Sequence, residues 1–175
     1  MNHIEIEKYH PCSEALRFRM QYQTFKEAWQ ACPRGDWMLW IAQKVGVDLR
    51  TLTRAKALCA LTVRHLMKDE RSVRACEVAL KFADGEATRE ELDAAYADAA
   101  AAAYAADDAY AAAYAATDAA YAAADAAYAA AAAAYAADDA DDADDADARI
   151  KSQQQTAEIC REHLTSAVLE KLNLV

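Results

Sequence analysis

The chain has 175 residues, a formal net charge of −10 at pH 7, and only three Gly and two Pro. So few turn-forming residues disfavour a strand-rich fold and favour long helices. Tyr and Asp interrupt the alanine runs, which argues against a membrane-spanning helix, and the first eight residues lack the basic and apolar regions of a signal peptide. Five Cys without paired spacing indicate reduced thiols, so we expect a cytoplasmic protein.

Two amphipathic stretches open the chain. Apolar residues recur at spacings of three and four over residues 13–31, which predicts one helix with Ser13 as its N-cap. Its expected buried stripe is Ala15, Phe18, Tyr22, Phe25 and Trp29. After a turn, Asp36 is the expected N-cap of a short helix, and Gly46 lies just beyond its end. That helix carries Trp37, Leu39, Trp40 and Ile41.

Two further amphipathic helices follow. Asp48 opens the third, whose expected core face is Leu52, Ala55, Cys59, Val63 and Leu66. The fourth lies near residues 70–83 and ends at Asp84 and Gly85. Its expected core face is Val73, Cys76, Leu80 and Ala83. Residues 88–91, Thr-Arg-Glu-Glu, form a capping box that announces the next helix.

Residues 93–148, the acidic segment, consist of Ala, Tyr and Asp with one Thr. Alanine has the highest helix propensity, so we expect helix here. One straight helix of 56 residues would span roughly 84 Å, so we expect a reversal near Asp107 and Asp108 or within residues 138–147. The last helix is expected over about 147–171. Its core positions are Ile150, Ala157, Cys160, Leu164 and Val168.

These elements predict an all-α fold. An N-terminal four-helix subdomain is followed by long Ala-rich helices that form a helical bundle or hairpin. The predicted divisions are an amphipathic helical subdomain over 1–92, a helical region over 93–148, and a C-terminal helix over 149–175 that packs back on the core.

Charge is unevenly distributed along the chain. The acidic segment has 13 Asp and no basic residue, whereas residues 1–92 have a net charge of +2 and residues 149–175 of +1. Such a segment repels a phosphate backbone and attracts a basic partner, so we expect no direct nucleic-acid binding.

Tyrosine and aspartate alternate within the acidic segment at spacings of four and three, which places them on one helical face. The candidate partner-binding residues of this ladder are Tyr114, Asp118, Tyr121, Asp125 and Tyr128. The face has two possible roles. It is either a packing seam, including one between two copies of the chain, or a recognition surface in which Tyr supplies contact area and Asp supplies charge.

Seven Asp crowd into residues 138–147. The partner-binding candidates there are Asp138, Asp139, Asp141 and Asp142. A calcium loop needs a tight turn, usually with Gly, and a distal Glu; this run has neither, so we predict no metal site. A solvated acidic stretch is one interpretation, and imitation of phosphates is another.

Signals for catalysis are weak, and we predict no enzyme and no cofactor. Four His show no metal-ligand spacing, and there is no Gly-rich phosphate loop. Cys59 and His65 are interpreted as structural. Arg50, Arg54 and His65 share the polar face of the third helix, which is either solvated or an anion site.

Residues 32–42, CPRGDWMLWIA, resemble a stretch in a family of Ala-rich bacterial immunity proteins (immunity-five-like). The resemblance continues at residues 55–60, 85–92 and 157–162, and covers most of the chain from about residue 25. The chain departs from the family pattern in having many Asp and no Arg within the Ala-rich run. The resemblance implies a helical protein of toxin and phage conflict, and it assigns no catalytic residue.

The sequence thus predicts a non-enzymatic inhibitor that neutralises a basic protein, either a toxin or a nucleic-acid-binding effector, in the cytosol of a bacterium or a phage-infected host. One alternative is a phage anti-defence protein, anti-CRISPR-like, that mimics nucleic acid. Another is a sponge that sequesters a nucleotide signal between Tyr rings, with Arg50 or Arg54 on its phosphates. A purely structural or oligomeric role is a further alternative, because an Ala/Tyr seam with heptad spacing could equally pair two chains in a homodimer.

Overall fold

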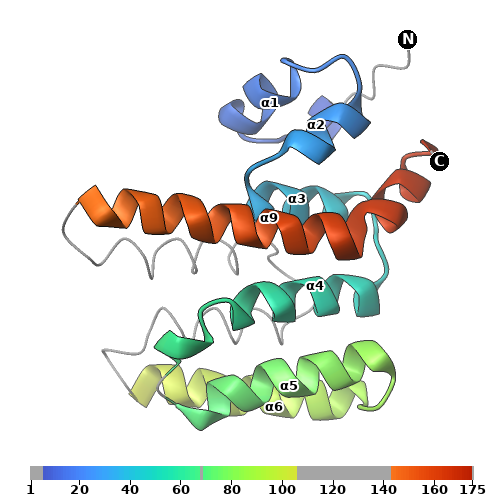
Figure 1. The fold of residues 1–175 in the computed structure, drawn as a ribbon. Coiled ribbons are helices and arrows are strands. Elements are labelled where there is room, and N and C mark those ends of the chain that lie inside the picture. Colours follow the sequence, from blue (N-terminus) through green and yellow to red (C-terminus); the bar gives the residue numbers. More distant parts are fainter. Residues whose placement is uncertain (1–5, 68, 106–142, 175) are drawn as a thin grey trace.

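The computed structural model describes residues 6–67, 69–105 and 143–174, and describes side chains over 6–67, 69–100 and 150–174. Within these ranges all regular structure is helical, which confirms the all-α prediction (Figure 1). The α-helices are α1 (Ser13–Arg19), α2 (Phe25–Ala31), α3 (Gly35–Lys44), α4 (Leu49–Leu61), α5 (Glu70–Asp84), α6 (Arg89–Ala105) and α9 (Ala143–Lys171). Two 3₁₀ turns, η1 (Ile6–Tyr9) and η2 (Arg64–Leu66), complete the set.

Helix α4 lies between two groups of helices. On one side α9 packs against both α3 and α4, and on the other α5 packs against α4 and forms an antiparallel hairpin with α6 (Figure 1). Helices α1 and α2 lie at the end of the molecule away from this hairpin. Among the described helices, none combines the length and apolar character required to cross a bilayer.

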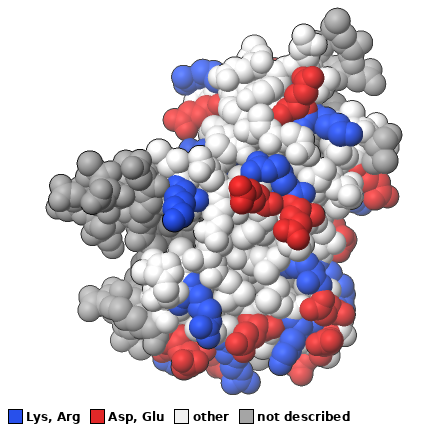
Figure 2. Space-filling view, in the orientation of Figure 1, with Lys and Arg blue, Asp and Glu red and all other residues white. Residues whose placement is uncertain are grey.

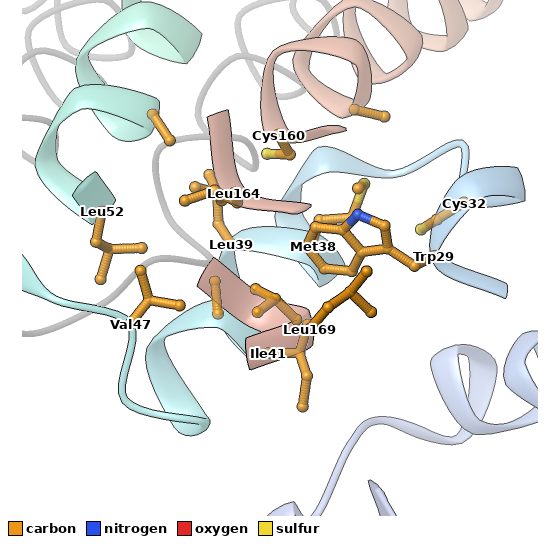
Figure 3. Close-up of a cluster of buried hydrophobic side chains, with 14 of the residues drawn as sticks. Trp29, Cys32, Met38, Leu39, Ile41, Val47, Leu52, Cys160, Leu164 and Leu169 are labelled. Carbon is orange, nitrogen blue, oxygen red and sulfur yellow. The ribbon is translucent and has the colours of Figure 1, made fainter. Parts of the chain in front are cut away.

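The first cluster of buried side chains joins α2, α3, α4 and α9 (Figure 3). Leu39 of α3 and Leu164 of α9 are fully buried at its centre, and Trp29 and Met38 lie together beside them. Predicted core positions Ala157, Cys160, Leu164 and Val168 are all fully buried. The periodicity of the C-terminal helix therefore identified the face that packs on α3 and α4.

The second cluster joins α4, α5 and α6, and small side chains make up most of its fully buried part. Ala57 and Ala60 of α4 face Ala75, Cys76 and Ala79 of α5, and all five are fully buried. Small side chains allow two helices to approach closely and to bury backbone as well as side-chain atoms. Helix α4 therefore belongs to both clusters and connects them.

Several predicted helix ends are confirmed. Asp48 caps α4 by accepting a hydrogen bond from the Thr51 amide at 3.0 Å. Gly46 and Gly85 take left-handed φ angles of 80° and 84° after α3 and α5. In the capping box, the Thr88 amide donates to Glu91 at 2.8 Å and the Glu91 amide donates to Thr88 at 3.2 Å.

The single helix predicted over 13–31 is wrong, because the structure divides it into α1 and α2. Thr24 and Glu27 form a capping box with hydrogen bonds of 3.0 and 3.1 Å, and this starts a new helix inside the apolar pattern. Cys12, not Ser13, caps α1, since its Sγ accepts from the Ala15 amide at 3.4 Å. Of the predicted stripe, Phe25 and Trp29 are buried, and Ala15, Phe18 and Tyr22 are half-buried.

Other local predictions also need correction. Asp36 is not an N-cap: α3 begins at Gly35, and Asp36 instead accepts two hydrogen bonds from the Arg34 guanidinium. Ile150 and Leu66 are not core residues, with 50% and 36% of their surface exposed. On α5, Phe82 is buried, and the predicted Leu80 and Ala83 are half-buried.

The described ends of the acidic segment are helical. Helix α6 continues to Ala105, and α9 begins at Ala143, so the last helix starts four residues earlier than the predicted 147. Each of these helices runs through one of the predicted divisions at 92/93 and 148/149. The reversal predicted at Asp107 and Asp108, and the first part of the Asp-rich run, lie outside the described residues.

Candidate functional site

All nine partner-binding candidates predicted from sequence lie outside the described residues, so their grouping stays a prediction. They are Tyr114, Asp118, Tyr121, Asp125, Tyr128, Asp138, Asp139, Asp141 and Asp142. The side chains described from the acidic segment belong to α6. There Tyr96 is half-buried and packs against the second cluster, whereas Asp93 and Asp98 are exposed. In this part of the segment, Tyr faces the core and Asp faces solvent.

The proposed anion face of α4 has a structural role instead. The Arg50 guanidinium lies over the Phe82 ring, 4.6 Å from its centroid, and donates to the Phe82 carbonyl. Arg54 forms an ion pair with Asp84. Phe82 and Asp84 are in the last turn of α5, where the exposed carbonyls favour cations. Both arginines therefore dock α4 onto the end of α5, and the exposed His65 lies beyond α4 in η2.

The cysteines are free thiols, as predicted, and four of the five are buried. Burial raises the pKa of Cys32 to about 11 and the pKa of Cys76 to about 12. Burial also raises the pKa of Cys160 well above its usual value, and its contact with Cys59 adds to this. These thiols stay neutral at physiological pH, and a neutral thiol is a poor nucleophile and metal ligand. The described residues contain no group of three His, Cys, Asp or Glu able to hold a metal ion.

A charged groove lies between α5 and α6, with about 1020 Å³ of empty space including open solvent. Alanines Ala87, Ala94 and Ala95 form part of its wall. Its charged lining residues are Arg74, Lys81, Glu77, Glu86, Glu91 and Asp98. Carboxylates thus outnumber cations in this groove, and Asp98 belongs to the acidic segment.

A second hollow, the aromatic groove, lies between η1, α1, α2 and α3. Its empty space is about 460 Å³, which includes open solvent. Trp29, Met38 and Ile41 are buried in its wall, and Trp37 and Trp40 are half-buried. Figure 3 shows Trp29 and Met38 side by side, with Cys32 beyond them.

Arg19 is the single charged side chain among the described residues that line the aromatic groove. Only 8% of its surface is exposed. One guanidinium nitrogen, Nη1, donates to the Tyr22 carbonyl at 2.8 Å. The Nε is buried without a hydrogen-bond partner. Sequence reasoning missed this residue because an arginine beside a predicted apolar stripe, four residues after Ala15 and three before Tyr22, is ordinarily exposed to solvent.

Comparisons with protein-family models, with curated proteins and with solved structures give no match to this chain. The resemblance to the immunity family therefore stays an expectation from sequence. The candidate sites rest on their own geometry and chemistry.

Proposed function

We propose that this protein is a non-enzymatic binding protein that neutralises a basic macromolecular partner through its acidic segment. The observation that carries this proposal is the separation of charge. The acidic segment has 13 Asp and no Lys or Arg, and the remainder of the chain has a net charge of only +3, from the +2 of residues 1–92 and the +1 of residues 149–175.

Four of the ten arginines with described side chains form ion pairs with carboxylates close to them. Arg34 pairs with Asp36 at 2.5 Å, and Arg71 pairs with Asp69 at 2.9 Å. Arg89 pairs with Asp93 at 2.9 Å, and Arg54 pairs with Asp84. Figure 2 accordingly shows basic and acidic side chains beside one another over the visible face. Basic and acidic residues nearly balance over residues 1–92 and 149–175, so the negative charge of the acidic segment is available to a partner.

The groove between α5 and α6 supports a basic partner as well. Four of its six charged lining residues are acidic, and Asp98 links it to the acidic segment. A lysine or arginine entering this groove would meet more carboxylates than cations, over an apolar wall that covers its methylene stem. The resemblance to immunity proteins is compatible with this role, with a toxin as the partner.

The two alternative functions differ in which residues of the chain could support them. Nucleic-acid mimicry also depends on closely spaced Asp residues. It predicts a partner that binds nucleic acid, and added nucleic acid should displace this protein from that partner. The nucleotide sponge loses its proposed phosphate ligands, because Arg50 and Arg54 are engaged with the end of α5. We therefore favour a protein partner, with mimicry as the second candidate.

The test begins by capturing partners from a bacterial lysate with the full chain and measuring the affinity of each purified partner by calorimetry. Replacing Asp118 and Asp125 by Asn should weaken binding at least about tenfold and should reduce its salt dependence, because charge is lost without loss of size. The matched control is Glu70→Gln with Glu158→Gln, which removes two exposed carboxylates elsewhere. Equal losses in both double variants, or none in either, would contradict the proposal. Competition by duplex DNA would favour mimicry.

A further inference from the structure

We propose that the aromatic groove between α1, α2 and α3 is a binding site for a small, flat, apolar monoanion, such as an aromatic sulfonate or carboxylate, and that Arg19 holds its charge. This site goes beyond the proposed function, since it uses none of the residues of the acidic segment or of the α5–α6 groove.

Arg19 is a buried cation beside the aromatic groove. A guanidinium stays protonated in proteins, so its burial has to be balanced by acceptors or by a negative charge. Here Nη1 reaches the Tyr22 carbonyl, and Nε has no partner. None of the carboxylates in the described ranges forms an ion pair with Arg19. An anionic oxygen in the groove would satisfy both the hydrogen bond and the charge.

Aromatic rings form much of the wall of the groove. Phe25 and Trp29 stack with ring centroids 6.0 Å apart, and Phe18 and Trp37 lie tilted at 5.8 Å. Rings held in this way offer flat apolar surface with little side-chain freedom left to lose on binding. A planar ring system is therefore the shape that the groove favours.

The other polar groups around the groove already have hydrogen-bond partners within the protein, which limits the polar groups that a ligand could contact there. The Trp29 indole donates to Thr165 at 2.8 Å, and the Cys32 thiol donates to the Arg34 carbonyl at 3.4 Å. Arg34 itself covers the Trp37 ring from 4.6 Å and pairs with Asp36. Arg19 is thus the lining residue with a donor to spare, so one negative charge is the expected limit.

A pair of fluorescent probes tests this proposal directly. 8-Anilino-1-naphthalenesulfonate is an apolar aromatic monoanion, and N-phenyl-1-naphthylamine has the same ring system without the sulfonate. On the full-length wild-type protein, titration should give an affinity at least about tenfold tighter for the sulfonate, as expected when one charge-assisted hydrogen bond is made in a buried site. Equal affinities, or no binding of the sulfonate, would overturn the proposal.

Variants then locate the site. Arg19→Met should reduce the affinity for the sulfonate about tenfold or more and leave the affinity for the neutral probe within about twofold. Arg17→Met is the matched control, because Arg17 is exposed on the same helix, and it should change neither. If Arg19→Met lowers the helical signal, Ala15→Phe provides the second test, since it adds bulk at the half-buried edge of the groove and should weaken both probes. A sulfonate affinity that follows Arg17, or that ignores both Arg19 and Ala15, would refute the assignment.

Discussion

The indole Nε1 of Trp29 donates a hydrogen bond of 2.8 Å to the hydroxyl of Thr165, 136 positions later in the chain. It joins α2 to the C-terminal helix α9 and so connects the two ends of the described chain. Trp29 is only 3% exposed, and the Thr165 hydroxyl in turn donates to the Arg161 carbonyl at 2.5 Å. The contact therefore lies in a short chain of hydrogen bonds at the edge of the first cluster.

Thr165→Val should destabilise the protein by about 1–3 kcal/mol, because a buried indole N–H loses its acceptor while the side chain keeps its shape. The free energy of unfolding in urea, followed by circular dichroism, measures this effect. Thr165→Ser keeps the hydroxyl and should cost less. If Val and Ser variants are equally stable, the hydrogen bond does not contribute as the geometry implies.

Local features of the sequence predicted helix ends well and predicted long-range contacts poorly. Asp48, Gly46, Gly85 and the 88–91 capping box act within four residues of themselves, so their chemistry can be recognised without the fold. Thr24 and Glu27 form the same kind of box, but they lie within a stretch whose apolar spacing is also compatible with one long helix. The spacing of apolar residues does not reveal a short break between two helices when the same spacing continues after the break.

The aromatic groove could not be predicted for the same reason. The break at residues 20–24 lets α1 turn relative to α2, and the groove that forms between these helices and α3 is lined by Arg19 at the end of α1. Likewise, the pairing of Arg50 and Arg54 with α5 depends on how two helices pack, which composition alone does not define. The predicted Tyr and Asp ladder stays untested, since it lies outside the described ranges.

Gly35 should be required for the contact between α3 and α9. A Cβ at this position would lie 2.7 Å from the backbone carbonyl carbon of Thr156, closer than real side chains approach. Gly35→Ala should therefore destabilise the protein by about 1–3 kcal/mol or more through overpacking. Thermal unfolding and the urea midpoint measure this change.

Gly46→Ala is the informative comparison for Gly35. Nothing lies within 4 Å of a Cβ at position 46, but its φ of +80° is unfavourable for alanine. This substitution should cost roughly 1 kcal/mol from backbone strain alone. Gly46→Asn should recover part of the loss, because Asn tolerates the left-handed conformation. At position 35, by contrast, no residue larger than Gly should restore the lost stability. If Gly35→Ala were as stable as the wild type, α3 and α9 would not approach each other as closely as the structure shows.

The two arginines that dock α4 on α5 should contribute unequally. Arg50 contacts both the Phe82 ring and its carbonyl, so Arg50→Ala should cost about 1–2 kcal/mol. Arg54 makes an ion pair with 34% of its own side chain and 45% of the Asp84 side chain exposed, so Arg54→Ala should cost at most about 1 kcal/mol. Only the Arg54 effect should shrink markedly in high salt. Arg64→Ala, at an exposed position in η2, serves as the control in urea unfolding.

Stability should fall in alkaline solution because buried thiols resist ionisation in the folded protein. The pKa of Cys76 rises from 9.0 to about 12 and that of Cys32 from 9.0 to about 11, with burial as the main cause of each. Below pH 9 both thiols are neutral in the folded and unfolded chains, and the stabilisation is complete. Between pH 9 and the folded pKa only the unfolded chain loses its proton, so the free energy of unfolding decreases as pH rises.

Each of these two thiols should account for a loss on the order of 3 kcal/mol by the time the folded pKa is reached. Tyr and Lys titrate in the same range, so the measurement is the difference in pH dependence between the wild type and Cys76→Ala, with urea unfolding from pH 8 to 11. The variant should start less stable, because it loses a buried sulfur, and should lose stability less steeply above pH 9. In the folded wild type at pH 8, a thiol reagent should modify the exposed Cys12 and leave the other four until the chain unfolds. Rapid modification of two or more thiols in the folded state would mean that the first and second clusters open far more readily than their packing implies.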